Sequence, residues 1–290
     1  MKTHLFSSQN SPGVNKPMTY LFDVIRQYMV SLKRYHALRG MIRDQSLTTY
    51  FQPVISLQEG SPLGYEVLNR PPASSLFPNT EAFYDFIGHT DQVFAFERAS
   101  RDLSFNRFCA ALTRSDKPRD TVIFINIHPQ VLLDTNYRSG ETLQLLSRYG
   151  LSPKQVVFEL TEKQAVHDYV EFERILYHYR AQGFRVAIDD AGSGYNSLKA
   201  IVSLKPEFIK LDKSLIRNVH QCPNQQRIVK LLQEFAAESG THIIAEGIEA
   251  REEFVFLQQE GIEYGQGYAI GRPATELQTA SLPVCEKTSM

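Results

Sequence analysis

The chain has 290 residues, of which 42% are hydrophobic and 11% aromatic, enough to bury the core of one large α/β domain or two small ones. The formal net charge of −1 excludes a general attraction to DNA or to an anionic membrane, so any phosphate-containing ligand must be recognised locally.

Nothing in the sequence predicts secretion or membrane insertion. The three cysteines, Cys109, Cys222 and Cys285, lie far apart and form no CxxC pair, which favours a reducing compartment. The polar N-terminus lacks the apolar stretch of a signal peptide, and no apolar run approaches the roughly 18 residues that cross a bilayer. We therefore expect a soluble, cytoplasmic protein.

The N-terminal region divides into a tail and a helix. Residues 1–17 are rich in Ser, Asn, Pro and Gly, which predicts a flexible tail. Over residues 18–45 the pattern predicts a helix, because apolar residues recur at helical steps: Leu21, Ile25, Tyr28, Leu32, Tyr35 and Ile42. Two interpretations remain open, because periodicity does not separate them. The helix packs on its own domain, or it contacts a second subunit or a regulatory partner.

Residues 46–276 alternate between strands and helices. Two strands, "TYFQPVISL" and "LGYEVLNRP", are joined by a turn at residues 59–62, and a long helical stretch over 80–114 follows. Helices are also predicted at 168–182 and after Pro223. Six further short apolar strands are predicted: "VIFINI", "VVFEL", "VAID", "FIKLD", "HIIAE" and "YGQGYAI".

This alternation predicts parallel strands joined by crossovers. Eight nearly continuous apolar strands favour a closed (β/α)8 barrel. An open, doubly wound sheet is the alternative, although no GxGxxG fingerprint follows the first strand. Residues 277–290 show no clear pattern and are predicted to form a C-terminal tail.

Polar residues gather at the C-terminal ends of the predicted strands. In a barrel these ends meet at one mouth, where active sites are built. A charge at one strand end is usually only solvated, but seven strands that end this way predict a site. The residues are Glu66, Asn126, Glu159, Asp189, Asp190, Lys210, Asp212, Glu246, Glu249 and Gln266.

The excess of negative charge at this mouth predicts bound cations. Five carboxylates would meet there, and Lys210 alone cannot balance them. Carboxylates with one amide, Asn126, suit hard cations such as Mg²⁺ or Mn²⁺, whereas zinc would be expected to recruit His or Cys. The adjacent Asp189 and Asp190 make sense if one carboxylate bridges two ions, and two such ions can promote displacement at phosphorus.

Other residues of the mouth have two interpretations each. Lys210 could hold the attacking water or offset charge in the transition state. Arg70 could grip a phosphate oxygen or form a surface salt bridge. Gly192 and Gly194 could let the loop approach a ligand, or form an ordinary tight turn.

These motifs resemble the EAL domain family of cyclic di-GMP phosphodiesterases over residues 48–274. "YFQPVISL" resembles the family's first strand, and "GYEVLNRP" stands where the family has its Glu-Ala-Leu motif. Further motifs follow in the family's order: "NIHPQVL", "FELTE", "DDAGSGYNSL", "FIKLDKSLI", "AEGIE" and "QGYAIGRP".

The resemblance implies a TIM-like barrel with one antiparallel strand that hydrolyses cyclic di-GMP to linear pGpG with two ions, Mg²⁺ or Mn²⁺. It implies that one ion is held by Glu66, Asn126, Glu159 and Asp189, and the other by Asp189, Asp190 and Glu246. It further implies water-orienting roles for Lys210 and Gln266, a supporting carboxylate at Glu249, substrate contacts for Gln52 and Arg70, and a loop anchor at Glu162.

The sequence departs from the family pattern at two positions. Val67 replaces the alanine of the name-giving motif and leaves the carboxylate of Glu66 in place. Ala191 replaces the phenylalanine that usually follows the two aspartates. In the family that loop is tied to the dimer interface and to the second metal site, so dimer coupling is in question here.

Three functional hypotheses follow. The first is an active two-metal phosphodiesterase, because every ligand position holds a competent residue. The second is a catalytically inactive receptor that binds cyclic di-GMP and signals through a protein partner. The third is a diverged barrel that serves as an interaction scaffold through the 18–43 helix. The physiological metal, the regulatory input and the oligomeric state are not determined by the sequence.

Overall fold

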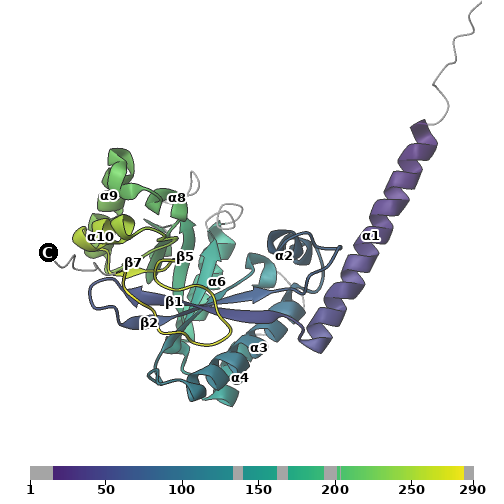
Figure 1. Cartoon of the computed structure of the whole chain (residues 1–290). Helices are drawn as coiled ribbons and strands as arrows, with labels where there is room; N and C mark the ends of the chain where they lie inside the picture. Colours follow the sequence, from purple (N-terminus) through teal and green to yellow (C-terminus); the bar gives the residue numbers. More distant parts are fainter. Residues whose placement is uncertain (1–15, 133–139, 162–168, 193–200, 203, 284–290) are drawn as a thin grey trace, which may run out of the picture.

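The computed structural model describes residues 16–132, 140–161, 169–192, 201–202 and 204–283, and these form a closed eight-stranded barrel with helices around it (Figure 1). Strand β1 is antiparallel to both of its neighbours, and the other adjacent strands are parallel. The predicted barrel with one antiparallel strand is confirmed. Its strands are β1 (Thr48–Ser56), β2 (Pro62–Arg70), β3 (Val122–Asn126), β4 (Val156–Thr161), β5 (Arg185–Ala191), β6 (Phe208–Leu211), β7 (His242–Ala245) and β8 (Tyr264–Gly265).

The helices that accompany these strands lie on the outside of the barrel (Figure 1). They pack on the strands through two apolar clusters, one on the α2–α6 side and one on the α8–α10 side. The helices are α1 (Lys16–Asp44), α2 (Thr80–Gly88), α3 (Val93–Arg114), α4 (Glu141–Tyr149), α6 (Tyr169–Ala181), α8 (Lys213–Ile216), α9 (Pro223–Ser239) and α10 (Arg251–Gln259).

The prediction of one long helix over residues 80–114 is wrong, because the chain breaks between α2 and α3. The side chain of Asn79 caps the start of α2 by accepting a hydrogen bond from the Ala82 amide at 2.7 Å. At the other end, the Thr90 hydroxyl donates to the Ile87 carbonyl at 2.8 Å. This side-chain bond satisfies a terminal carbonyl and ends the helix where apolar periodicity alone continues it.

Alternation along the strands sorts the barrel interior into two layers. Side chains two residues apart point to the same side of a strand, so Phe124 and Asn126 both face inward from β3, as do Phe208 and Lys210 from β6. The lower layer is an apolar cluster of Val54, Val122, Phe124, Val157, Ala187, Phe208 and Ile244. The polar residues stand directly above this floor, toward the C-terminal ends of the parallel strands.

The two ends of the described chain behave differently. Near the C-terminus, Leu277 is buried in the core, and the Tyr65 hydroxyl donates to the Gln278 carbonyl at 2.8 Å. At the N-terminus, α1 projects away from the barrel (Figure 1). No helix in the described part of the chain combines the length and the apolar character needed to cross a membrane.

Candidate active site

The polar layer places side chains from six strands at one level. Register pairs Asn126 of β3 with Glu159 of β4, and Gln52 of β1 with Glu66 of β2. The Asn126 amide donates to Glu159 Oε2 at 3.2 Å and more weakly to Glu66 Oε1 at 3.4 Å. These bonds hold the two carboxylates beside each other, with the amide between them.

Lys210 lies at the centre of this layer and is fully buried. Its Nζ lies 2.7 Å from Glu159 Oε1, 2.8 Å from Glu246 Oε1, 3.0 Å from Asp189 Oδ1 and 3.5 Å from Glu66 Oε2. Burial on its own would lower the pKa of the ammonium, but the four carboxylates outweigh it and hold the Lys210 pKa well above its usual value. The side chain is therefore positively charged at neutral pH.

One ammonium does not neutralise the surrounding acids. Burial raises the pKa of Glu159 and of Glu246 well above the usual value, and Lys210 only partly opposes that rise. The contacts of Lys210 to Glu159 Oε1 and Asp189 Oδ1 have ion-pair distances but not hydrogen-bond angles. Apart from Lys210, no described residue donates a hydrogen bond to either oxygen. Buried carboxylate oxygens without donors fit a site that takes further cations.

Three carboxylates, two of which also contact Lys210, have the spacing of a metal site. Ligand oxygens of Asp189, Asp190 and Glu246 lie within 4.8 Å of one another, and the three residues are buried or partly buried. Oxygen donors of this kind suit Mg²⁺, Mn²⁺ or Ca²⁺. Asp189 and Glu246 both belong also to the layer around Lys210, so each carboxylate lies where one ligand could serve two ions.

The backbone at Asp190 explains how two adjacent aspartates reach the same mouth. Successive side chains of a regular strand point to opposite faces. Asp190 has φ 56°, in the left-handed region, and the register of β5 against β6 shifts between Ile188 and Ala191. Such a bulge re-aims a side chain, so Asp190 joins Asp189 at the mouth. Ala191, which follows, is fully buried in the cluster that holds Leu211 and Leu215.

Substitutions at Asp190 separate backbone strain from ligand chemistry. Alanine is disfavoured at positive φ, whereas glycine is not, so we expect Asp190→Gly to be more stable than Asp190→Ala by about 1 kcal/mol in EDTA. Both variants should lose most of the rise in Tm that Mn²⁺ gives the wild type. Thermal unfolding with and without Mn²⁺ measures both effects. Equal stability of the two variants in EDTA would contradict the backbone assignment, and a wild-type Mn²⁺ shift would remove Asp190 from the ligands.

A chain of side-chain amides fixes Glu66. Gln266 Nε2 donates to Glu66 Oε2 at 2.6 Å and to Gln52 Oε1 at 3.1 Å, and Gln52 Nε2 donates to the Gly271 carbonyl at 3.0 Å. All three side chains are buried. A Cβ at Gly267 would lie 2.1 Å from the Ile248 carbonyl oxygen, so only glycine lets the segment after Gln266 pack this closely.

Glu249, which the sequence places at the mouth, is not part of this layer. Glu249 pairs with Arg217 at 2.6 Å, and both side chains are partly exposed. Its backbone amide, with that of Ala250, is bound by the buried Glu253 side chain. Glu162 lies outside the described residues, so its expected role as a loop anchor stays a prediction.

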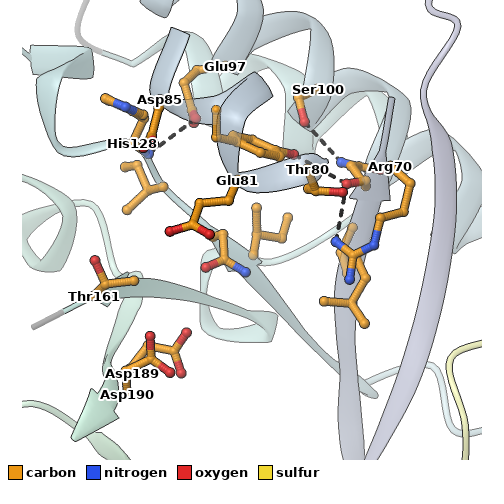
Figure 2. Close-up of a pocket in the computed structure, with 17 residues that line it drawn as sticks. Arg70, Thr80, Glu81, Asp85, Glu97, Ser100, His128, Thr161, Asp189 and Asp190 are labelled. Carbon is orange, nitrogen blue, oxygen red and sulfur yellow. Dashed lines mark hydrogen bonds between the residues drawn. The ribbon is translucent and has the colours of Figure 1, made fainter. Parts of the chain in front are cut away.

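A pocket of about 440 Å³ opens beside the acidic layer. Figure 2 shows Glu81 pointing from α2 into this space, with Arg70 on one side and Asp189 and Asp190 on the other. The break between α2 and α3 lets α2 form this wall, and an unbroken helix over 80–114 would not bring Thr80, Glu81, Tyr84 and Asp85 to the mouth. The other polar lining residues that were not predicted are Glu97 and Ser100 of α3, His128 after β3 and Thr161 of β4.

A buried ion pair supports the loop after Asn126. Glu97 Oε1 accepts a hydrogen bond from the His128 amide at 3.2 Å (Figure 2). Glu97 Oε2 pairs with Arg101 at 2.9 Å. Arg101 also donates to the Thr142 hydroxyl at 2.9 Å. Burial lowers the pKa of His128 to about 4, so this ring is neutral at neutral pH and adds no positive charge to the pocket.

Comparison with known proteins assigns this chain to a family. A family model described as "EAL domain" matches residues 36–273. The chain belongs to the EAL domain family. The resemblance seen in the sequence motifs is thereby confirmed. One curated relative, the cyclic di-GMP phosphodiesterase RocR of Pseudomonas aeruginosa, is 28% identical over 243 residues, which cover 82% of this chain and 60% of RocR.

Solved structures of EAL domain proteins share the barrel. The calcium and cyclic di-GMP complex of BlrP1 from Klebsiella pneumoniae has a TM-score of 0.72 at 25% identity, over 82% of this chain and 58% of BlrP1. BlrP1 has also been solved with manganese and cyclic di-GMP. A standalone EAL protein of Vibrio cholerae bound to cyclic di-GMP has a TM-score of 0.70 at 28% identity, over 81% of this chain and 95% of that protein.

The curated relatives are longer proteins. This chain spans between 20% and 60% of the length of eight of them, RocR at the upper limit. The shared part is the EAL domain, and the remaining parts of those relatives have no counterpart in the match.

Proposed function

We propose that this EAL domain is a phosphodiesterase that hydrolyses cyclic di-GMP to linear pGpG with two divalent ions, Mg²⁺ or Mn²⁺. The observation that carries the proposal is the complete acidic layer: five carboxylates and the Asn126 amide converge around one buried lysine, beside a pocket of about 440 Å³. That volume falls within the range of about 300–1,000 Å³ typical of ligand pockets.

The side chains divide into two metal-binding sets. Asp189, Asp190 and Glu246 would hold one ion, and Asp189 belongs also to the second set, which consists of Glu66, Asn126, Glu159 and Asp189. With five carboxylates and one lysine the layer carries up to four excess negative charges, which two divalent cations would balance. When bound, the ions supply Lewis-acid polarisation of the phosphodiester and activate water.

The protein's own residues would orient the substrate and the water. Lys210, fixed by its carboxylate contacts, would hold the attacking water and offset negative charge that develops at phosphorus. The Arg70 guanidinium, on the pocket wall, would bind a phosphate oxygen. In the hydrolysis the water oxygen bonds to phosphorus, one P–O ester bond breaks, and a proton goes to the departing sugar oxygen.

The α2 wall supports a guanine-containing substrate. Glu81 and Asp85 present carboxylates to the pocket, and guanine carries N–H donors on N1 and N2 that such acceptors can bind (Figure 2). The pocket therefore joins hydrogen-bond acceptors for a base, a cation for a phosphate and a metal-binding layer. We keep as proposals the roles that the sequence predicts for Glu249, Glu162 and Gln52: a supporting carboxylate, a loop anchor and a substrate contact. The cytoplasmic location is likewise a proposal.

Incubation of the purified chain with cyclic di-GMP tests the function. We expect pGpG to appear with Mg²⁺ or Mn²⁺ and not with EDTA, as measured by chromatography. Intact nucleotide together with metal-dependent binding would favour the catalytically inactive receptor over the enzyme. Absence of both turnover and binding would overturn both and favour a scaffold that acts through α1.

A further inference from the structure

The N-terminal half of α1 exposes an unusual number of large apolar side chains. Eight of them are between 38% and 67% exposed, and all eight lie on the continuous helix α1. We call these eight residues the apolar band: Met18, Leu21, Phe22, Val24, Ile25, Tyr28, Met29 and Leu32. Exposed apolar clusters of this kind mark interaction sites in folded proteins.

The band follows a heptad pattern. Met18, Ile25 and Leu32 are seven residues apart, and Leu21 and Tyr28 fall between them at the alternate three- and four-residue steps of a coiled-coil seam. Phe22, Val24 and Met29 flank this seam and widen it. Two further exposed apolar residues, Tyr20 and Val30, lie outside the band.

The charged residues of this segment keep to the other side of the helix. Within residues 16–34 they are Lys16, Asp23, Arg26, Lys33 and Arg34, and every one falls at a heptad position away from the seam and its flanks. The pattern continues until Arg39 occupies a seam position, where α1 has already reached the barrel. The band is thus a bounded surface that is apolar on one side and charged on the other.

The C-terminal part of α1 is firmly attached to the barrel, so the band is held away from it. Leu38 is fully buried, and Arg34 Nε donates to the Leu76 carbonyl at 2.8 Å. The Arg34 guanidinium also lies 5.8 Å from the Phe77 ring centre, and the Tyr35 hydroxyl donates to Asp91 at 3.0 Å. This attachment leaves residues 18–32 projecting as a helix into the solvent (Figure 1).

We propose that the apolar band packs against the same band of a second copy of this chain. A large apolar side chain presents on the order of 150–250 Å² when fully exposed, so eight that are about half exposed offer roughly 800 Å². A standard interface buries about 800 Å² of each partner, which the band reaches when its exposed apolar surface is almost fully covered. A self-complementary apolar stripe is what a two-fold pair of helices requires.

Charge favours a second copy over a lipid surface. Within the band, at residues 18–32, the charges Asp23 and Arg26 cancel; the basic residues Lys16, Lys33 and Arg34 lie only at its ends, and Arg34 already contacts Leu76 and Phe77. Amphipathic helices that lie on membranes instead carry an excess of Lys and Arg on the polar face, to bind anionic headgroups. This inference concerns assembly and does not depend on the proposed hydrolysis of cyclic di-GMP.

Two matched substitutions test the pairing. Ile25→Glu places a carboxylate in the middle of the seam, and Val30→Glu places the same group on the same helix outside the band. Burial of an unpaired charge is costly, so we expect Ile25→Glu to weaken dimerisation at least about tenfold and Val30→Glu to leave it nearly unchanged. Sedimentation equilibrium of the full chain at micromolar concentrations gives the dissociation constants, and thermal unfolding checks that both barrels fold.

Other outcomes would overturn the proposal. A wild-type chain that stays monomeric, or a dimer that both substitutions leave unchanged or weaken equally, would exclude the band as the interface. Co-sedimentation with vesicles of mixed neutral and anionic lipids tests whether the band binds a lipid surface instead. Vesicle binding by a monomeric wild type that Ile25→Glu abolishes would assign the band to a lipid surface.

Discussion

Asp189→Ala is expected to abolish hydrolysis of cyclic di-GMP. Asp189 contacts Lys210, belongs to the metal-type group with Asp190 and Glu246, and is the ligand that the two proposed ion sites share. Its removal would weaken both ion sites at once. Metal ions contribute several kcal/mol of transition-state stabilisation, which corresponds to a loss of about 10³-fold or more in rate. Initial rates at saturating Mn²⁺, read by chromatography, measure the loss.

Unfolding does not account for such a loss if the variant stays stable. Asp189→Ala removes one of several repelling carboxylates, so its Tm in EDTA should equal or exceed that of the wild type. Glu263→Ala is the matched control, because it removes a carboxylate that pairs with His242 at the opposite end of the barrel. That control should hydrolyse at the wild-type rate. Wild-type turnover by Asp189→Ala would refute the two-metal assignment.

Lys210→Met is expected to separate catalysis from binding and to destabilise the metal-free protein. Methionine keeps the length of the side chain but removes the charge that four carboxylates surround. Loss of electrostatic stabilisation at one such group lowers kcat by about 10²–10³-fold, and KM should change little because the lysine acts on the water. Steady-state kinetics checks this split, and an unchanged kcat would remove Lys210 from the mechanism.

The effect of Lys210→Met on stability depends on pH. Loss of one partner of a buried ion pair costs about 3–5 kcal/mol at neutral pH. Glu159 and Glu246 have raised pKa values in the folded state, so their contribution to stability is complete below the ordinary value of 4.5 and is lost as pH rises. Without Lys210 these pKa values rise further, so the difference in Tm between variant and wild type should widen with increasing pH.

The same Tm measurements are made with added Mn²⁺ and on a surface control variant, Lys230→Met. Mn²⁺ replaces part of the missing positive charge and should restore much of the lost stability at neutral pH. Lys230→Met removes an exposed pair with Glu260 and should cost less than about 1 kcal/mol at every pH. Destabilisation of Lys210→Met no larger than that of Lys230→Met would contradict the central electrostatic role of Lys210.

The amino-acid sequence by itself determined the barrel and most of its acidic layer. Strands such as "VIFINI" and "FIKLD" are apolar up to a polar residue near the C-terminal end, so the sequence alone places Asn126 and Lys210 at the mouth. Alternation puts each of them on the inward face, two residues after Phe124 and Phe208. These features are local, because strand alternation and the polarity of strand ends depend on residues within a few positions of each other.

Only the tertiary structure decided which of these residues touch. Lys210 meets carboxylates from three other strands and the loop after β7, and Gln266 bonds Gln52, 214 positions away in the sequence. The left-handed backbone at Asp190 arises from a bulge between two strands, and the break after Gly88 that turns α2 over the pocket arises from side-chain caps. Glu249 pairs with Arg217 instead of entering the layer. Such contacts depend on how distant segments pack, and strand periodicity carries no information about that packing.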